Sequence, residues 1–122
     1  MPARVRRGDP AAVAAARERW ERGDAEGADL RLLVKDTLAL LSERAPGSSV
    51  EVRVPPYAAV QVVGGTTHKR GTPPAVVETT AETWLDLALG REDWHRAVGS
   101  GSVLASGERS DLSALLPLHP AP

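Results

Sequence analysis

The sequence predicts an α+β domain, and three observations support this. Its 122 residues fit one domain of ordinary size and leave little room for a second core. Apolar residues recur at helical spacing between positions 30 and 41, then alternate with polar residues between 50 and 54, as in a half-buried strand. After residue 79, start and stop signals typical of helices return. Helices and strands are therefore both expected to contribute to one core.

The first predicted helix covers residues 10–22. Asp9 is a typical N-cap, and Pro10 is favoured at the first helical position because its missing N–H costs nothing there. The apolar stripe of Val13, Ala16 and Trp20 is thin, so we expect it to pack weakly. Residues 1–28 are accordingly predicted to form an N-terminal arm with a short helix.

The second predicted helix is the clearest element. Asp29 is the expected cap, and Pro46-Gly47 ends the pattern. One face carries the apolar residues Leu30, Leu33, Val34, Leu38 and Leu41. Their full burial would contribute on the order of 10 kcal/mol before chain entropy is subtracted, which makes this helix part of the core.

Three strands are predicted next. Val50, Val52 and Val54 alternate with polar residues, and Pro55-Pro56 ends this strand. Residues 57–63 form the second strand, closed by Gly64-Gly65. A polar loop covers residues 66–74, and residues 75–79 form a short third strand.

The last third of the chain contains mostly helical signals. Thr79 and Glu82 match a capping box, and Gly90 ends the helix that follows. A short helix is expected over residues 92–98, with Trp94, Ala97 and Val98 facing inward. A fourth strand is expected over residues 102–106, with either Val103 and Ala105 or Leu104 facing inward. A final helical turn or two should run from residue 110 to 116, and residues 118–122 should form a flexible tail.

Composition excludes several classes of protein. The chain has no cysteine, which rules out disulfides, thiolate catalysis and iron–sulfur clusters. A formal net charge of -1 argues against a dedicated nucleic-acid binder, which must neutralise many phosphates. No apolar stretch approaches the ~20 residues of a membrane span, and no secretory signal is recognised, so we expect a cytoplasmic protein.

Candidate catalytic and metal sites are weak. The three histidines, His68, His95 and His119, are too far apart in sequence to suggest a zinc site, so no metal is expected. The glycines and serines of residues 99–102 lack the G-x-S-x-G spacing of a nucleophile elbow. Residues 64–71 combine glycines with basic groups, but the order of a phosphate-binding loop is absent. A hairpin connection is the first interpretation of this stretch, and an anion contact is the second.

Two enzymatic alternatives remain open. One uses His68 together with Arg70, and the other uses the carboxylates Glu82 and Asp86, which share a face if residues 80–90 are helical. Both require a perturbed histidine or carboxylate pKa in a cleft. Solvated surface residues explain the same pattern more simply.

From residue 79 onward the chain resembles the sterol carrier protein family of small lipid-transfer domains. The matching residues are Trp84-Leu85-Asp86-Leu87-Ala88-Leu89-Gly90-Arg91, Trp94, Ala97, Ser100-Gly101, Val103, Ser106-Gly107 and Asp111-Leu112. A bacterial branch of that family has stretches similar to residues 53–61 and 70–74. The resemblance covers about residues 29–117, which we take as the sterol carrier-like domain.

The resemblance implies an antiparallel sheet of about four or five strands with helices packed on one face and an apolar cavity between the layers. That cavity would hold a fatty acyl chain or a sterol-like molecule, without catalysis and without a cofactor. Carried over by position, its lining is Val60, Val62, Trp84, Leu85, Trp94, Leu112, Leu115 and Leu116. Ordinary core packing is the competing interpretation of each of these residues.

An alternative function is an accessory or oligomerisation module with a collapsed pocket. Related domains resemble the C-terminal part of maleylpyruvate isomerase-type enzymes, in which the chemistry belongs to another domain. In that case the N-terminal helix around Trp20 would bind a protein partner or form a homodimer.

Overall fold

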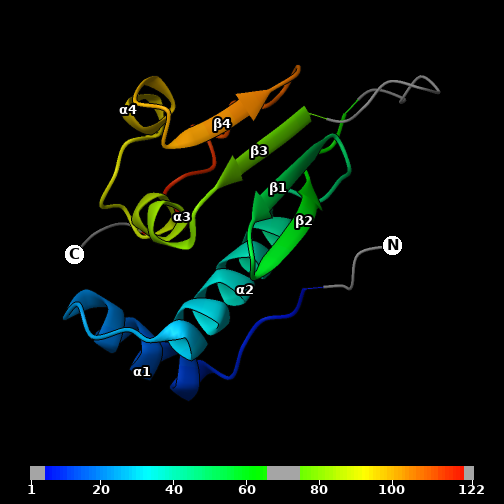
Figure 1. The fold of residues 1–122 in the computed structure, drawn as a ribbon. Coiled ribbons are helices and arrows are strands. Elements are labelled where there is room, and N and C mark those ends of the chain that lie inside the picture. The colour runs from blue at the N-terminus through cyan, green and yellow to red at the C-terminus, as the bar shows by residue number, and fades with distance from the viewer. Residues whose placement is uncertain (1–4, 66–74, 120–122) are drawn as a thin grey trace.

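The computed structural model describes residues 5–65 and 75–119, and its elements follow the order shown in Figure 1. The helices are α1 (Pro10–Glu21), α2 (Gly27–Arg44), α3 (Ala81–Ala88) and α4 (Trp94–Gly99). The strands are β1 (Val50–Val54), β2 (Ala58–Val62), β3 (Ala75–Thr79) and β4 (Val103–Ser106). No helix within the described ranges is long and apolar enough to cross a membrane.

The four strands form one sheet in the order β2-β1-β3-β4. β1 pairs antiparallel with β2, and β3 pairs antiparallel with β4. The central pair, β1 with β3, is parallel, with Val52 opposite Val77. The hairpin expected between the second and third strands is therefore wrong, because β1 lies between β2 and β3 in the sheet. The sheet is therefore mixed but mostly antiparallel, and it has the number of strands that the family resemblance implies.

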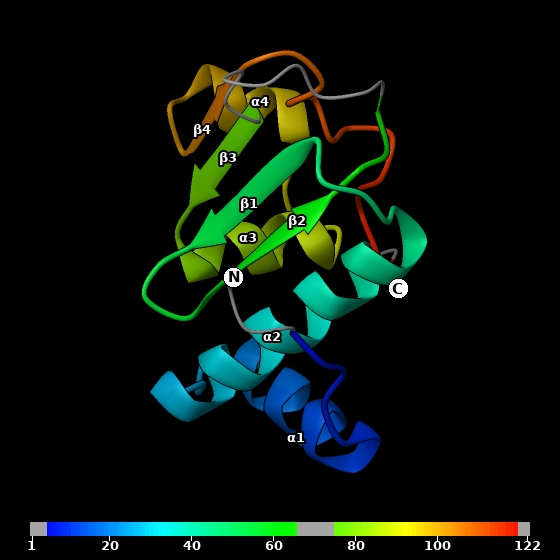
Figure 2. The ribbon, with the colours of Figure 1, turned by 90° about the vertical axis from the view of Figure 1, so that its right-hand side faces the viewer.

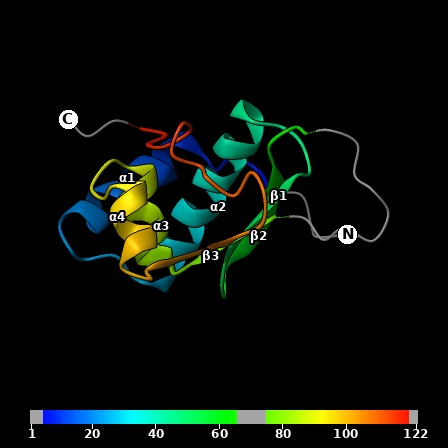
Figure 3. The same cartoon turned by 90° about the horizontal axis from the view of Figure 1, so that it is seen from above.

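The helices lie together on one side of the sheet (Figure 3). α2 and α3 cover the sheet, and α1 packs on α2 on the side away from the strands (Figure 2). The alternation in β1 explains this arrangement, because Val50, Val52 and Val54 are fully buried while Arg53 is exposed. The predicted α+β fold with helices on one face is confirmed.

Two predicted helix starts are wrong by a few residues. α2 is capped by Glu26, and Asp29 is the third helical residue, whose carboxylate accepts the Glu26 backbone N–H at 3.1 Å. α3 is capped by Thr80, whose hydroxyl accepts the N–H of Thr83, while Thr79 Oγ1 donates to the carbonyl of Ser102. In both cases a neighbouring residue satisfies the free N–H groups of the first turn.

The predicted final helix is wrong. Residues 113–115 form only a turn, closed by the Leu115 N–H on the Leu112 carbonyl at 2.9 Å. Leu112 is nevertheless fully buried, so its side chain packs into the core although no helix forms here. One or two isolated turns rarely repay the cost of helix nucleation, and Pro117 prevents a longer helix.

The chain remains attached beyond Pro117. Leu118, the first residue of the expected flexible tail, is buried, and its N–H bonds the Ala88 carbonyl at 2.8 Å. Arg44 Nη1 also donates to the Leu118 carbonyl at 2.6 Å. This segment therefore ties the end of α2 to the end of α3, and residues 120–122 lie outside the described residues.

Ion pairs as well as apolar contacts hold the N-terminal residues to α2. Arg19 reaches Asp29 with two hydrogen bonds of 2.7 and 3.0 Å. Arg7 Nε and the Gly8 backbone N–H both donate to Asp36, at 2.9 and 2.8 Å. Both carboxylates are buried, so the face of α2 that carries them is covered by the residues before it in the chain.

Candidate functional site

The apolar side chains expected to line a cavity are brought together between the sheet and the helices. Val62, Trp84, Leu85, Trp94 and Leu112 are buried members of one hydrophobic cluster. The remaining three are partly buried and pack against that cluster: Val60, Leu115 and Leu116. Residues from β2, α3, α4 and the C-terminal segment therefore share one apolar interior, as expected from the sequence.

Trp84 makes a buried hydrogen bond within this cluster. Its side chain is fully buried, and Nε1 donates a 2.8 Å hydrogen bond to Thr37 Oγ1 on α2. Thr37 Oγ1 in turn donates to the Leu33 carbonyl at 2.7 Å. A buried indole N–H requires such an acceptor, so this pair fixes both the indole and the position of α3 on α2.

Sequence reasoning missed Thr37. The residue lies on the same face of α2 as Leu33, Val34 and Leu41, where its hydroxyl interrupts the apolar pattern. A threonine inside an otherwise apolar helical face is a usable signal, because a buried hydroxyl needs a partner. The pattern does not identify that partner, which is 47 residues away in the sequence.

Trp94 enters the cluster from α4. Asp93 caps this helix by accepting the Arg96 N–H at 3.0 Å, which fixes the first turn. Trp94 and Ala97 then face inward and are buried, whereas Val98 on the next position is exposed. The inward positions expected for Trp94 and Ala97 are confirmed, and the inward position expected for Val98 is wrong.

Two of the described acid–base candidates, Asp86 and His119, have shifted pKa values. Partial burial raises the pKa of Asp86, and nearby Arg91 opposes that rise. Glu82 and His95 are exposed, and burial lowers the pKa of His119. His68 and Arg70 lie outside the described residues.

No arrangement for catalysis or metal binding is found in the described residues. Within residues 5–65 and 75–119, no hydrogen bond joins a histidine ring to a serine, threonine or carboxylate side chain. The same ranges hold no group of three or more histidine, aspartate or glutamate residues able to bind a metal.

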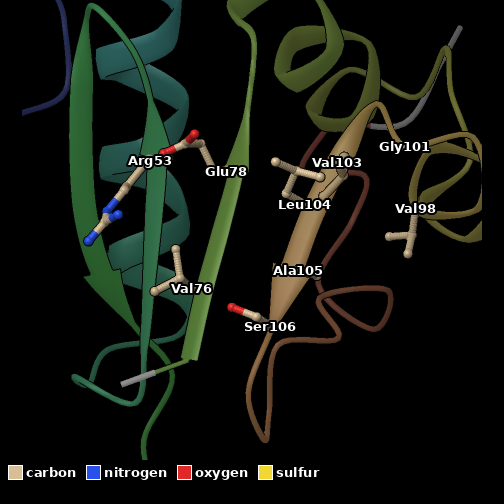
Figure 4. Close-up of a pocket in the computed structure, with 9 residues that line it drawn as sticks. All are labelled: Arg53, Val76, Glu78, Val98, Gly101, Val103, Leu104, Ala105 and Ser106. Carbon is tan, nitrogen blue, oxygen red and sulfur yellow. The ribbon is translucent and has the colours of Figure 1, made fainter. Parts of the chain in front are cut away.

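A hollow of about 570 Å³ lies on the opposite, outer face of the sheet (Figure 4). Leu104 on β4 and Val98 on α4 are its exposed apolar side chains, at 64% and 37% exposure. Arg53 and Glu78 contribute charges from the neighbouring strands β1 and β3. Leu104 thus faces outward, while Val103 and Ala105 are the inward residues of β4.

A second hollow, of about 540 Å³, lies beside the N-terminal half of α2. Its lining combines the exposed cations Arg31 and Lys35 with Leu32 and Tyr57, both of which are partly buried. Tyr57 comes from the turn between β1 and β2, which reaches toward the start of α2 (Figure 2). Sequence reasoning did not single out any of these four residues.

Comparison with known proteins gives the family of the chain. No curated protein sequence matches it. A family model described as "Bacterial SCP ortholog" matches residues 26–118, which excludes α1 and includes every residue expected to line the cavity. The match begins at the cap of α2 and ends at the buried Leu118, so it spans the whole sheet and the helices that cover it. The chain therefore belongs to the bacterial branch of the sterol carrier protein family.

Proposed function

We propose that the protein binds or carries a lipid or another hydrophobic small molecule between its sheet and its helices, without catalysing a reaction. Membership of the sterol carrier family over residues 26–118 carries the proposal. It is supported by the single apolar cluster that contains or contacts all of the proposed lining residues, Val60, Val62, Trp84, Leu85, Trp94, Leu112, Leu115 and Leu116.

Apolar burial alone can supply the affinity. Ten methylene groups at ~0.8 kcal/mol each contribute about 8 kcal/mol, which corresponds to micromolar binding before the costs of ordering are subtracted. The interior needs no catalytic group for this, and the apolar cluster formed by the sheet and the helices is suited to it. We therefore propose a fatty acyl chain or a sterol-like molecule as the guest.

An accessory module with a closed interior is the alternative function, and the full burial of Trp84 and Leu85 favours it. An empty apolar cavity of ~300 Å³ costs about 7 kcal/mol at ~24 cal/mol per Å³. Domains have a total stability of only about 5–15 kcal/mol. We therefore expect the interior either to hold a guest in the purified protein or to close when it is empty.

Native mass spectrometry of the delipidated protein, titrated with fatty acids and sterols, tests the proposal. We expect a one-to-one complex at tens of micromolar ligand. The absence of any bound species at that concentration would contradict the carrier function and favour the accessory module.

A matched pair of variants locates the site. Val60→Trp adds bulk to a partly buried position on the inner face of β2, whereas Leu104→Trp adds it to the exposed outer face. We expect Val60→Trp to weaken ligand binding at least about tenfold, or ~1.4 kcal/mol, and Leu104→Trp to leave it unchanged. Equal effects of the two substitutions would place the ligand outside the proposed interior.

A further inference from the structure

The hollow between α2 and the β1–β2 turn is lined by two cations and by no carboxylate. Its lining residues are Gly27, Ala28, Arg31, Leu32, Lys35 and Tyr57. Among the described residues, no carboxylate lies within ion-pair distance of Arg31 or Lys35. By contrast, several arginines elsewhere form ion pairs, including Arg7 with Asp36 and Arg19 with Asp29.

The sequence of α2 places these two cations next to each other. Arg31 and Lys35 are one turn apart on the same face, where like charges repel. No acidic residue occurs three or four positions before or after either of them on the helix. The acidic residues of the same helix, Asp29, Asp36 and Glu43, already pair with Arg19 or Arg7. A bound anion would relieve the repulsion that α2 leaves uncompensated.

The hollow also has an apolar component beside the charges. Leu32 and Tyr57 are partly buried and pack against the hydrophobic cluster that contains Trp84 and Leu85. A Cβ placed on Gly27 would lie 4.0 Å from the Tyr57 hydroxyl, so this O–H lies over the first turn of α2 and can donate to a ligand. A ligand that fits this lining has an anionic group attached to an apolar body.

We propose that Arg31, Lys35 and Tyr57 bind the anionic headgroup, a carboxylate or a phosphate, of an amphiphile whose apolar part lies against Leu32 and Tyr57. The inference rests on the proposed function and deepens it, because it names the class of hydrophobic ligand that the protein prefers. Since Leu32 and Tyr57 contact the core cluster, the tail of such a ligand can continue from the hollow toward the apolar interior.

Calorimetric titration with dodecanoate and with dodecanol tests the headgroup, because the two ligands share one chain length and differ in charge. We expect dodecanoate to bind the unmodified protein at least about tenfold more tightly. The double variant Arg31→Gln, Lys35→Gln should lose that advantage and bind dodecanol as before. The control double variant Arg22→Gln, Arg96→Gln also removes two positive charges, but at exposed positions outside the hollow. It should keep the preference of the unmodified protein for dodecanoate.

The outcomes separate this inference from the carrier proposal. If the Arg31, Lys35 variant binds dodecanoate as tightly as the unmodified protein, the headgroup site is wrong while the interior carrier site stands. If neither amphiphile binds the unmodified protein, both proposals are wrong. Inorganic phosphate alone is the control for a free anion, and affinity equal to that of dodecanoate would overturn the amphiphile class because the apolar part would contribute nothing.

Discussion

Trp84 and Thr37 form a buried hydrogen bond of 2.8 Å between the indole Nε1 and the threonine Oγ1. Both residues have at most 2% exposure, and the Thr37 hydroxyl donates its own hydrogen bond to the Leu33 carbonyl. Water cannot replace either partner at such depth, so losing one partner leaves the other unsatisfied. The contact joins α2 to α3 at the centre of the proposed site.

Thr37→Val should destabilise the protein by about 1–3 kcal/mol, because it removes the acceptor and leaves the Trp84 N–H buried without a partner. Urea unfolding measures the change. Thr37→Ser is the control, because it keeps the hydroxyl that accepts the hydrogen bond. We expect it to lower the free energy of unfolding by less than Thr37→Val does. Combining Thr37→Val with Trp84→Phe should cost less than the sum of the single changes, and strict additivity would contradict the coupling.

Trp84→Ala distinguishes a core residue from a wall of the ligand site. If Trp84 is only packed against other protein atoms, its removal should cost about 3–5 kcal/mol of unfolding free energy. A smaller loss, together with at least a fivefold change in ligand affinity, is expected if the indole contacts a guest molecule. Denaturant unfolding with and without fatty acid gives both quantities, and a large loss with unchanged affinity would remove Trp84 from the proposed lining.

The spacing of apolar and polar residues predicted individual strands and the faces that they bury. The alternation of Val50, Val52 and Val54 identified both a strand and its buried face correctly. In β4, three consecutive apolar residues left the inward face open, and only the structure identifies Leu104 as exposed. Alternation predicts which face of a strand is buried only when polar residues occupy the opposite face.

Relationships between distant segments were not predictable. The parallel pairing of β1 with β3 depends on where the chain crosses after β2, and residue periodicity contains no information about strand order. Burial of Asp36 likewise depends on Arg7, 29 residues earlier in the chain. For the site, the shared apolar interior of the eight expected residues was predictable, but the Thr37 acceptor and the Arg31–Lys35 hollow were not.

Gly47→Ala should destabilise the protein by more than about 1 kcal/mol. Gly47 has a φ of 148°, and a Cβ there would lie 2.2 Å from the Val63 carbonyl oxygen, which is backbone and cannot rotate away. Gly99→Ala is the matched control, because no atom lies within 4 Å of its added Cβ. Thermal unfolding compares the two, and equal melting temperatures would show that the segment between α2 and β1 can relax.

Asp29 should make the stability of the protein depend on pH in the acid range. Hydrogen bonds from the Arg19 side chain and then from the Glu26 backbone N–H hold the pKa of Asp29 below its ordinary value. In the unfolded chain the carboxyl returns to a pKa of about 3.9 and binds its proton at higher pH than in the folded protein. The contribution of Asp29 is therefore present above about pH 4 and is lost as the pH falls through the folded-state pKa.

Asp29→Asn removes this titration and isolates its effect. We expect the variant to be less stable than the unmodified protein at pH 7, since it loses the ion pair with Arg19. The difference should shrink as the pH falls toward 2, because the unmodified protein then loses the same interaction by protonation. Urea unfolding between pH 7 and 2 measures it, with Glu108→Gln as an exposed control. A constant difference across that range would mean that Arg19 does not stabilise the ionised form of Asp29, and that α1 is held to α2 by apolar contacts such as that of the buried Ala16.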